Sequence, residues 1–294
     1  MIATKLHEFT GHSDCIYTSA IHYPTQQLYT AGGDGMVAAW DCVVGGDGIL
    51  QVRVSASVYS MCLCRNKLLL GTRTGNLFVV DMDSKVEERN IEAHLQGIFD
   101  IVYDAELEQI YTVGFDGVLC VWDLEFNLLS STKLSEKSLR NICMLPGMLA
   151  IASSDFQIYL LDKLTLKPIQ TLKHHTNSVF ALAYNPLRKE LLSGGRDCYV
   201  KIWDTETWEL KKEYAGATLH INHISFNPEL AWYAVSSMDK TIKIFDSNTH
   251  EPLKFITQEK DQGHTSSINK TLWLDSNTII SVSDDKKAMI WSLK

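Results

Sequence analysis

The chain repeats one short pattern about every 40 residues along its length. The pattern is a small hydroxyl residue, an Asp four positions later and an aromatic residue six positions after that, usually followed by Asp. The strong copies are Thr30, Asp34, Trp40, Asp41; Thr112, Asp116, Trp122, Asp123; Ser193, Asp197, Trp203, Asp204; and Ser281, Asp285, Trp291. Each follows a histidine, which is His12, His94, His175 or His264. Weaker copies end at Val80-Asp81, Leu161-Asp162 and Phe245-Asp246, so seven units are present and a closed ring is expected.

The period, with Gly-His near the start of a unit and Trp-Asp near its end, resembles the WD-repeat family of β-propellers. The resemblance extends from Leu6 to Trp291, nearly the whole chain. The residues in the Trp position are numbers 40, 80, 122, 161, 203, 245 and 291, and such regular spacing matches one four-stranded blade per unit. The resemblance implies an all-β fold, a seven-bladed β-propeller with four antiparallel strands in each blade.

The fifth unit supports this interpretation independently of the resemblance. Its four runs of β-branched and aromatic residues are Val179–Tyr184, Glu190–Ser193, Tyr199–Asp204 and Leu210–Tyr214, and turn-forming residues separate them. A four-stranded sheet of this size cannot bury both of its faces alone. The sheets must therefore stack against one another around an axis. No segment has a sustained helical period, so almost no helix is expected, and the polar stretch from Thr257 to Gly263 is predicted to be a surface loop.

The two ends of the sequence predict how the ring closes. Unit seven stops at Lys294, directly after its third strand, and the run from Thr4 to Phe9 can supply the missing fourth strand. This pairing would remove an open sheet edge that invites aggregation. No linker or charge run interrupts the repeats, so residues 1–294 are expected to form a single domain.

The composition limits the classes of function. Hydrophobic residues make up 45% of the chain and charged residues 21%, which is ordinary for a globular protein. A formal net charge of −8 argues against a general nucleic-acid binder. No basic and apolar leader begins the sequence, and the seven cysteines have no disulfide or zinc spacing, so a cytoplasmic protein is expected. Cys62 and Cys64 lie two apart in a strand pattern and face the same way, so both are expected to be buried core thiols.

The recurring His, Ser or Thr, and Asp look like a hydrolase triad, but four complete sets argue against a single catalytic site. The resemblance implies instead a structural tetrad in which Trp, Ser or Thr, His and Asp are hydrogen-bonded. Units two, four and six carry apolar residues at the hydroxyl and Trp positions: Leu70 and Val80, Ile151 and Leu161, Val235 and Phe245. We therefore expect no enzyme and no cofactor. No metal is expected either, because no Cys or carboxylate joins His220 and His223, which lie near His174 and His175.

The resemblance also implies where partners dock, on the face formed by the loops that enter each first strand and the turns that hold the pattern's first Asp. The residues before that Asp form one ring: Gly33, Arg73, Phe115, Ser154, Arg196, Met238 and Asp284. Residues early in the first strands form a second ring, with the register open by one residue in units one, two and four: Tyr17, Tyr59, Phe99, Arg140, Phe180, Asn222 and Asn269.

Arg and aromatic side chains dominate both rings, and these residue types carry binding energy at interfaces. The hypothesis is that Arg73, Arg140 and Arg196 bind a carboxylate or phosphate amid aromatic walls. In the alternative, Arg73 and Arg196 pair with acids of neighbouring blades, and Phe99 and Phe180 pack in the channel wall. Trp208, in a turn near solvent, is a candidate anchor for a second partner or else folds back on its own blade.

The leading functional hypothesis is a non-enzymatic scaffold or adaptor that binds an acidic or phosphorylated peptide or protein loop. The protein would act as a monomer or as a subunit of a hetero-complex, without membrane contact. One alternative is a subunit of a ribonucleoprotein assembly, with arginines on phosphates and Tyr17, Tyr59 and Phe99 stacked on bases. A further alternative is an enzyme with its site in the central channel, which would require converging carboxylates or histidines.

Overall fold

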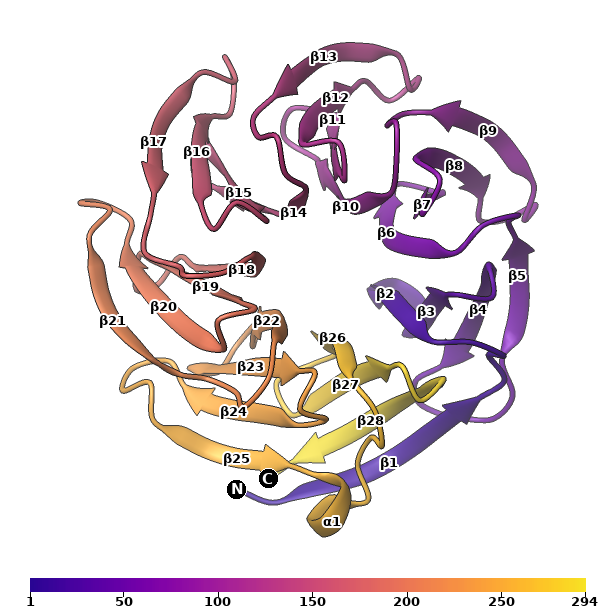
Figure 1. Cartoon of the computed structure of the whole chain (residues 1–294). Coiled ribbons are helices and arrows are strands. Elements are labelled where there is room, and N and C mark those ends of the chain that lie inside the picture. The colour runs from indigo at the N-terminus through magenta and orange to yellow at the C-terminus, as the bar shows by residue number, and fades with distance from the viewer.

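The computed structural model describes all 294 residues as a ring of seven four-stranded antiparallel sheets around a central channel (Figure 1). Blades one to three contain β2 (Ile16–His22), β3 (Gln27–Gly32), β4 (Met36–Asp41), β5 (Ile49–Arg53); β6 (Val58–Cys64), β7 (Lys67–Thr72), β8 (Asn76–Asp81), β9 (Glu87–Glu92); and β10 (Ile98–Asp104), β11 (Gln109–Gly114), β12 (Val118–Trp122), β13 (Leu128–Lys133). Blades four and five contain β14 (Leu139–Leu145), β15 (Met148–Ser153), β16 (Ile158–Asp162), β17 (Pro168–Leu172); and β18 (Val179–Asn185), β19 (Glu190–Gly195), β20 (Tyr199–Asp204), β21 (Leu210–Ala215). Blades six and seven contain β22 (Ile221–Phe226), β23 (Trp232–Ser237), β24 (Ile242–Asp246), β25 (Pro252–Ile256); and β26 (Ile268–Trp273), β27 (Thr278–Ser283), β28 (Lys287–Leu293), β1 (Ala3–Thr10).

The ring closes as the termini predicted. Strand β1 pairs antiparallel with β28, from Phe9 opposite Ala288 to Ala3 opposite Leu293. Beyond the strands, the backbone N–H of Ile2 donates to the carbonyl of Lys294 at 2.7 Å. Blade seven therefore joins the first and last segments of the chain in one sheet, and the all-β, seven-bladed prediction is confirmed.

Apolar side chains fill each of the seven gaps between neighbouring blades. Seven clusters of buried residues lie around the ring, one for each pair of adjacent blades. Each sheet buries one face against the blade before it and the other against the blade after it, which explains why the second and third strands are apolar on both faces.

Helical structure is confined to two short turns, as expected from the lack of helical periodicity. One is a 3₁₀ turn at Tyr23–Thr25 and the other is α1 (Gln258–Asp261). The predicted surface loop from Thr257 to Gly263 is therefore wrong in part. Thr257 Oγ1 caps α1 by accepting the N–H of Lys260, and Asp261 pairs with Lys254 at 2.6 Å. No helix of the structure has the length and apolar character needed to cross a membrane.

The cysteines correct one expectation. All seven are free thiols, but only Cys42, Cys64 and Cys120 are buried. Cys62, predicted to be a core thiol with Cys64, is partly exposed. The two do not share one environment, although alternation along a strand would place both on the same face.

Candidate functional site

The four complete tetrads form chains of hydrogen bonds that join the strands of a blade to its tight turn. In blade one, Trp40 Nε1 donates to Thr30 Oγ1 at 2.7 Å, and Thr30 Oγ1 lies 2.8 Å from His12 Nε2. His12 Nδ1 lies 3.0 Å from Asp34, whose carboxylate also accepts the backbone N–H of Ser13, next to His12, and that of Met36, just after the turn. The other three tetrads repeat this arrangement: Trp122, Thr112, His94, Asp116; Trp203, Ser193, His175, Asp197; Trp291, Ser281, His264, Asp285.

These bonds shift the ionisation of the tetrad carboxyls and of one histidine. Burial favours the neutral carboxyl, but the bonds from backbone N–H groups and from histidine outweigh it, so the pKa values of Asp34, Asp116, Asp197 and Asp285 lie below the usual range. Burial also disfavours charged His94, but the bond to Asp116 and the nearby Cys120 raise its pKa to about 9. Every hydroxyl of a tetrad is fully buried, so none is open to a substrate.

The even-numbered blades replace these networks only in part. The apolar residues at the hydroxyl and Trp positions, Leu70, Val80, Ile151, Leu161, Val235 and Phe245, all pack into the clusters between blades. The turn carboxylates of blades four and six keep other polar partners. Asp155 accepts from Ser135 and Tyr159 at 2.6 Å each, and Asp239 accepts from Thr241 at 2.6 Å and from Lys243 at 3.1 Å.

A β-bulge occurs near the start of every first strand. In β2, for example, Ile16 pairs with Gly32 and Thr18 with Ala31, so Tyr17 has no partner in the ladder. The register skips one residue in the same way in each of the seven blades. The skipped residues are Tyr17, Tyr59, Phe99, Arg140, Phe180, Asn222 and Asn269. A bulge re-aims side chains, and these seven are the second ring of the sequence prediction.

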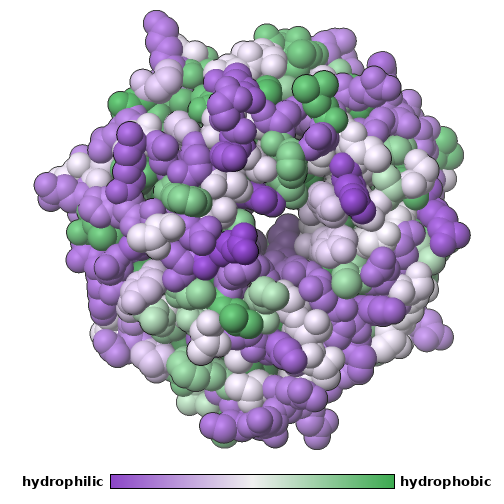
Figure 2. Space-filling view, in the orientation of Figure 1, coloured by the Kyte–Doolittle hydropathy of each residue, from purple (hydrophilic) through white to green (hydrophobic).

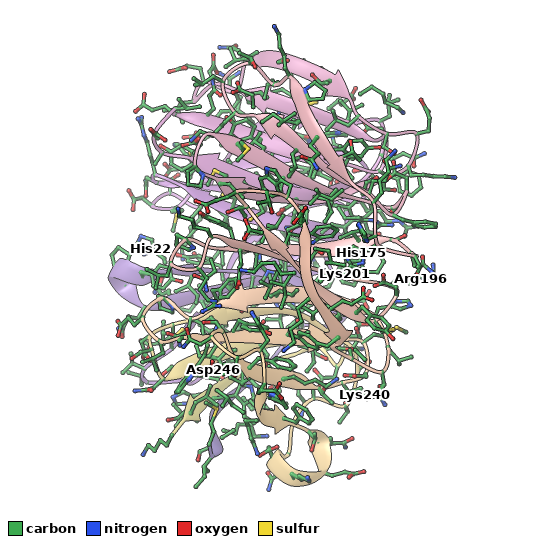
Figure 3. All side chains as sticks on the ribbon, turned by 90° about the vertical axis from the view of Figure 1, so that its left-hand side faces the viewer. His22, His175, Arg196, Lys201, Lys240 and Asp246 are labelled. Atoms are coloured by element: carbon green, nitrogen blue, oxygen red, sulfur yellow. The ribbon has the colours of Figure 1, made fainter.

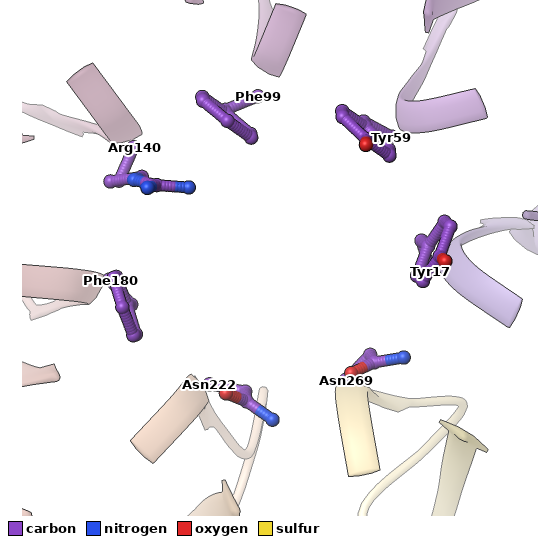
Figure 4. Close-up of a pocket in the computed structure, with 7 residues that line it drawn as sticks. All are labelled: Tyr17, Tyr59, Phe99, Arg140, Phe180, Asn222 and Asn269. Carbon is purple, nitrogen blue, oxygen red and sulfur yellow. The ribbon is translucent and has the colours of Figure 1, made fainter. Parts of the chain in front are cut away.

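The seven bulge residues line one pocket of about 390 Å³ at the mouth of the channel (Figure 4). Aromatic contacts run along one side of it. The rings of Tyr17 and Tyr59 meet edge-on at 5.5 Å between centroids, and Tyr59 stacks on Phe99 at 5.7 Å. The guanidinium carbon of Arg140 then lies 4.1 Å from the centre of the Phe99 ring and 5.3 Å from that of Phe180. The mouth therefore offers a cation held between two aromatic rings.

Arg140 is held in place but is not neutralised. Its Nε donates to Ser154 Oγ at 2.7 Å, and it forms no ion pair with any carboxylate. Burial lowers the pKa of Arg140 to about 10, so the side chain stays charged at neutral pH. In Figure 4 its guanidinium points into the opening, where its remaining N–H donors face the pocket.

The first predicted ring lies outside this pocket. Its Arg73, Phe115, Arg196 and Met238 are exposed, and neither arginine forms an ion pair. Figure 3 shows Arg196 with Lys240 at one face of the ring and His22 at the other. Figure 2 displays the face that carries Arg196, with the channel opening at its centre. Of the three arginines predicted to surround one mouth, only Arg140 lines it, and Arg73 lies in a separate pocket between blades one and two.

A second layer of side chains lies deeper in the channel, and sequence reasoning missed it as a unit. Below the mouth, a cavity of about 150 Å³ is lined by the bulge residues and by Thr18, Ser60, Asp100, Asn141, His223 and Lys270. All six directly follow a bulge residue in the sequence. No group of His, Cys, Asp or Glu side chains could hold a metal, so His223 belongs to no such cluster.

Trp208 folds back on its own blade. Its backbone is left-handed, with φ at 60°, and its N–H donates to the carbonyl of Asp204 at 2.8 Å. The side chain is partly buried and packs against the core cluster between blades four and five, as do Leu210 and Met148. This placement matches the alternative in which Trp208 packs within the protein.

Comparison with known proteins gives relatives along most of the chain. Protein tipD of Dictyostelium discoideum is 26% identical over 96% of this chain, which spans 48% of tipD. Ribosome biogenesis protein ytm1 of Aspergillus terreus is 28% identical over 72% of this chain, a match that covers 44% of ytm1. The human serine-threonine kinase receptor-associated protein is 22% identical over 87% of this chain, and the match covers 74% of that protein. This chain thus spans less than half of tipD.

The family described as "WD domain, G-beta repeat" matches residues 3–41, 166–204, 208–246 and 256–292, which together make up just over half of the chain. Three of these segments end at the residue directly after a tetrad Trp, namely Asp41, Asp204 and Ser292, and the fourth ends at Asp246, after Phe245 in a blade whose network is degenerate. With seven blades closed by the N-terminal strand, the chain belongs to the WD-repeat family.

Proposed function

We propose that this protein is a non-catalytic interaction module that binds an acidic or phosphorylated segment of a protein partner at the mouth of its channel. The observation that carries the proposal is Arg140, a charged guanidinium stacked between Phe99 and Phe180 with no carboxylate partner in the chain. A partly desolvated cation of this kind gains most from an incoming anion, and the aromatic walls favour apolar neighbours of that anion.

The family and the names of the relatives support the coarser part of this proposal. WD-repeat propellers generally serve as scaffolds, and none of the three relatives carries the name of an enzyme. One relative is named as associated with a kinase receptor, which fits a role through protein partners. We further propose that residues 1–294 act as one domain. The free thiols fit a reducing compartment, and we propose the cytoplasm.

A ribonucleoprotein role is the second candidate, and one comparison favours it. Several relatives are named ribosome biogenesis proteins, and the mouth presents stackable rings next to a cation. The net charge of −8 weighs against a large phosphate-binding surface. Binding to RNA through several phosphates would weaken steeply between low and moderate salt, whereas a peptide held by one arginine would depend on salt far less.

A channel-centred enzyme is the third candidate. Asp100 and His223 do lie together in the deeper layer, so the requirement for converging titratable groups is met in part. No nucleophile activated by a base accompanies them, because the hydroxyls of Ser60 and Thr18 have no bond to either group. Interaction through Arg140 therefore has the stronger support.

Partner capture from native lysate on immobilised protein tests the proposal. Arg140→Met removes the pocket cation, and Arg73→Glu/Arg196→Glu changes only exposed residues of the first ring, so the two variants separate the mouth from the surrounding turns. Circular dichroism must first establish that both variants fold. We expect specific partners to be lost with Arg140→Met. If Arg140→Met retains every partner of the wild type, the mouth is not the docking site.

A further inference from the structure

Some polar groups in the channel beneath the mouth have hydrogen-bond partners, and others have none. We name the deeper layer together with Arg140 the channel well: Arg140, Asp100, Asn141, His223 and Lys270, with Thr18 and Ser60 completing its wall. Asp100 is well held, because it accepts Asn141 Nδ2 at 2.7 Å and the backbone N–H of Ile142 at 2.9 Å. Of the two cations, Arg140 has one such partner, Ser154 Oγ, and Lys270 has none.

Lys270 and His223 are the unsatisfied groups. Lys270 forms no hydrogen bond or ion pair through its amine, although its side chain is partly buried in the channel wall and this burial lowers its pKa. The Nδ1 atom of His223 is buried without a partner. Burial and the charge of Lys270 lower the pKa of His223 to about 3, so the imidazole is neutral and keeps one N–H donor. A buried polar atom without a partner is costly, which makes the well a place where a ligand is stabilised.

Asp100 and Lys270 come from opposite sides of the ring. Figure 1 places β10, which carries Asp100, across the central opening from β26, which carries Lys270. The two charges influence each other's pKa but are not in contact. A group entering from the mouth passes Arg140 and then lies between the amine of Lys270 and the carboxylate of Asp100, which already accepts its own hydrogen bonds.

We propose that the channel well binds one carboxylate, inserted end-on from an Asp or Glu side chain of the partner, in preference to a phosphate. The inference rests on the proposed function, in which an acidic segment docks at the mouth, and it decides between the two anions left open there. Arg140 and Lys270 supply two positive charges, and Asp100 removes one. A single negative charge therefore balances the well, whereas a phosphate near two negative charges would face the carboxylate of Asp100.

The size of the well agrees with a small end group. The deeper cavity of about 150 Å³ lies below a mouth of about 390 Å³. The carboxylate of the inserted side chain would accept from Lys270 and from the N–H of His223, and its methylene groups would contact the rings of Phe99 and Phe180. Asn141 cannot turn its amide nitrogen toward the ligand without releasing Asp100, so Asp100 stays in place as the selecting charge.

The test uses the purified full chain with acetate and inorganic phosphate as probes at constant ionic strength. The ¹⁵N resonances of Arg140 Nε and Lys270 Nζ report occupancy. In the wild type we expect acetate to bind at least about tenfold more tightly than phosphate, the effect of one nearby like charge. Lys270→Met should weaken acetate about tenfold, and Asp100→Asn should strengthen phosphate until the preference is lost.

Two results would overturn the inference. One is equal binding of acetate and phosphate by the wild type, and the other is acetate binding that neither Lys270→Met nor Asp100→Asn changes. Asp100→Asn keeps an oxygen that can accept the bonds from Asn141 and Ile142, so it tests the charge even if Lys270→Met does not fold. Loss of partners with Arg140→Met but not with Lys270→Met would leave the docking face intact and remove only the carboxylate well.

Discussion

The tetrads and the channel well contain similar polar groups in opposite states. In the tetrads, every His, Asp and hydroxyl meets a partner within about 3 Å, and the members are buried together. In the well, Arg140 and Lys270 face the channel without carboxylate partners, and His223 has an unpartnered nitrogen. Satisfied networks hold a blade together, while unsatisfied groups of the same kind are available to a ligand and cost stability.

The two regions differ also in how they are built along the chain. A tetrad uses residues of one repeat and recurs in blades one, three, five and seven. The well takes one different side chain from each of several blades: Asp100 from the third, Asn141 from the fourth, His223 from the sixth and Lys270 from the seventh. Repetition therefore accompanies a structural role, and departure from the repeat at equivalent positions marks the candidate site.

Acid should produce the largest effect, and it should act on the two regions with opposite sign. The folded-state pKa values of the tetrad carboxyls are lowered, so their stabilisation is complete above the unfolded pKa and is lost as pH falls through the folded values. With four tetrads, this loss should amount to several kcal/mol in total. Burial instead raises the pKa of Asp100, so its ionisation costs stability as pH rises above the unfolded value.

Unfolding by urea at a series of pH values checks this contrast. Asp116→Asn should lower stability at neutral pH and reduce the loss on acidification. Asp100→Asn, the matched change in the well, should raise stability at neutral pH and make the acid loss steeper than in the wild type, because the protonation of Asp100 no longer offsets part of it. Similar pH profiles for the two variants would show instead that the two carboxyls occupy equivalent environments.

Removing one tetrad hydroxyl should produce the next largest effect. Thr112→Val keeps the side-chain shape but leaves the Trp122 indole N–H and the His94 ring without their partner, so we expect a loss of about 2 to 4 kcal/mol in the free energy of unfolding. Thr18→Val is the matched control in the channel wall, because the Thr18 hydroxyl makes no side-chain hydrogen bond. Its loss should stay below about 1 kcal/mol, and equal losses would contradict a special role for the tetrad.

The sequence predicted the fold, the closing strand and the seven residues of the mouth because all of them follow the repeat. The positions of Tyr17, Phe99 and Arg140 could be counted from each unit, and the structure places them at equivalent bulges. What remains a prediction is that this mouth binds a partner. The spacing could not give the lateral positions of Arg73 and Arg196, since these depend on how each turn leaves its blade.

The deeper layer was missed for a physical reason. Alternation along a strand assigns successive side chains to opposite faces, so Asp100 should point away from the channel if Phe99 points into it. At the bulge this rule fails, and two consecutive residues, such as Asn269 and Lys270, both line the channel. In the sequence, Lys270 is a charged residue directly after Asn269 of the second ring. It indicates a residue of the channel wall only if a bulge is expected at that position.

The smallest expected effect is the change in the free energy of unfolding when the unpaired cation Lys270 is replaced. Replacing Lys270 by Met removes a charge that burial disfavours and fills the wall with an apolar chain of similar length, so stability should rise by about 1 kcal/mol. Thermal and urea unfolding measure this gain, and acetate binding by the same variant should fall. A gain in stability together with a loss of binding is expected only if Lys270 is kept for a ligand. A loss of stability as large as that of Thr112→Val would mean that Lys270 serves the fold, as the tetrads do, through an interaction across the channel with Asp100.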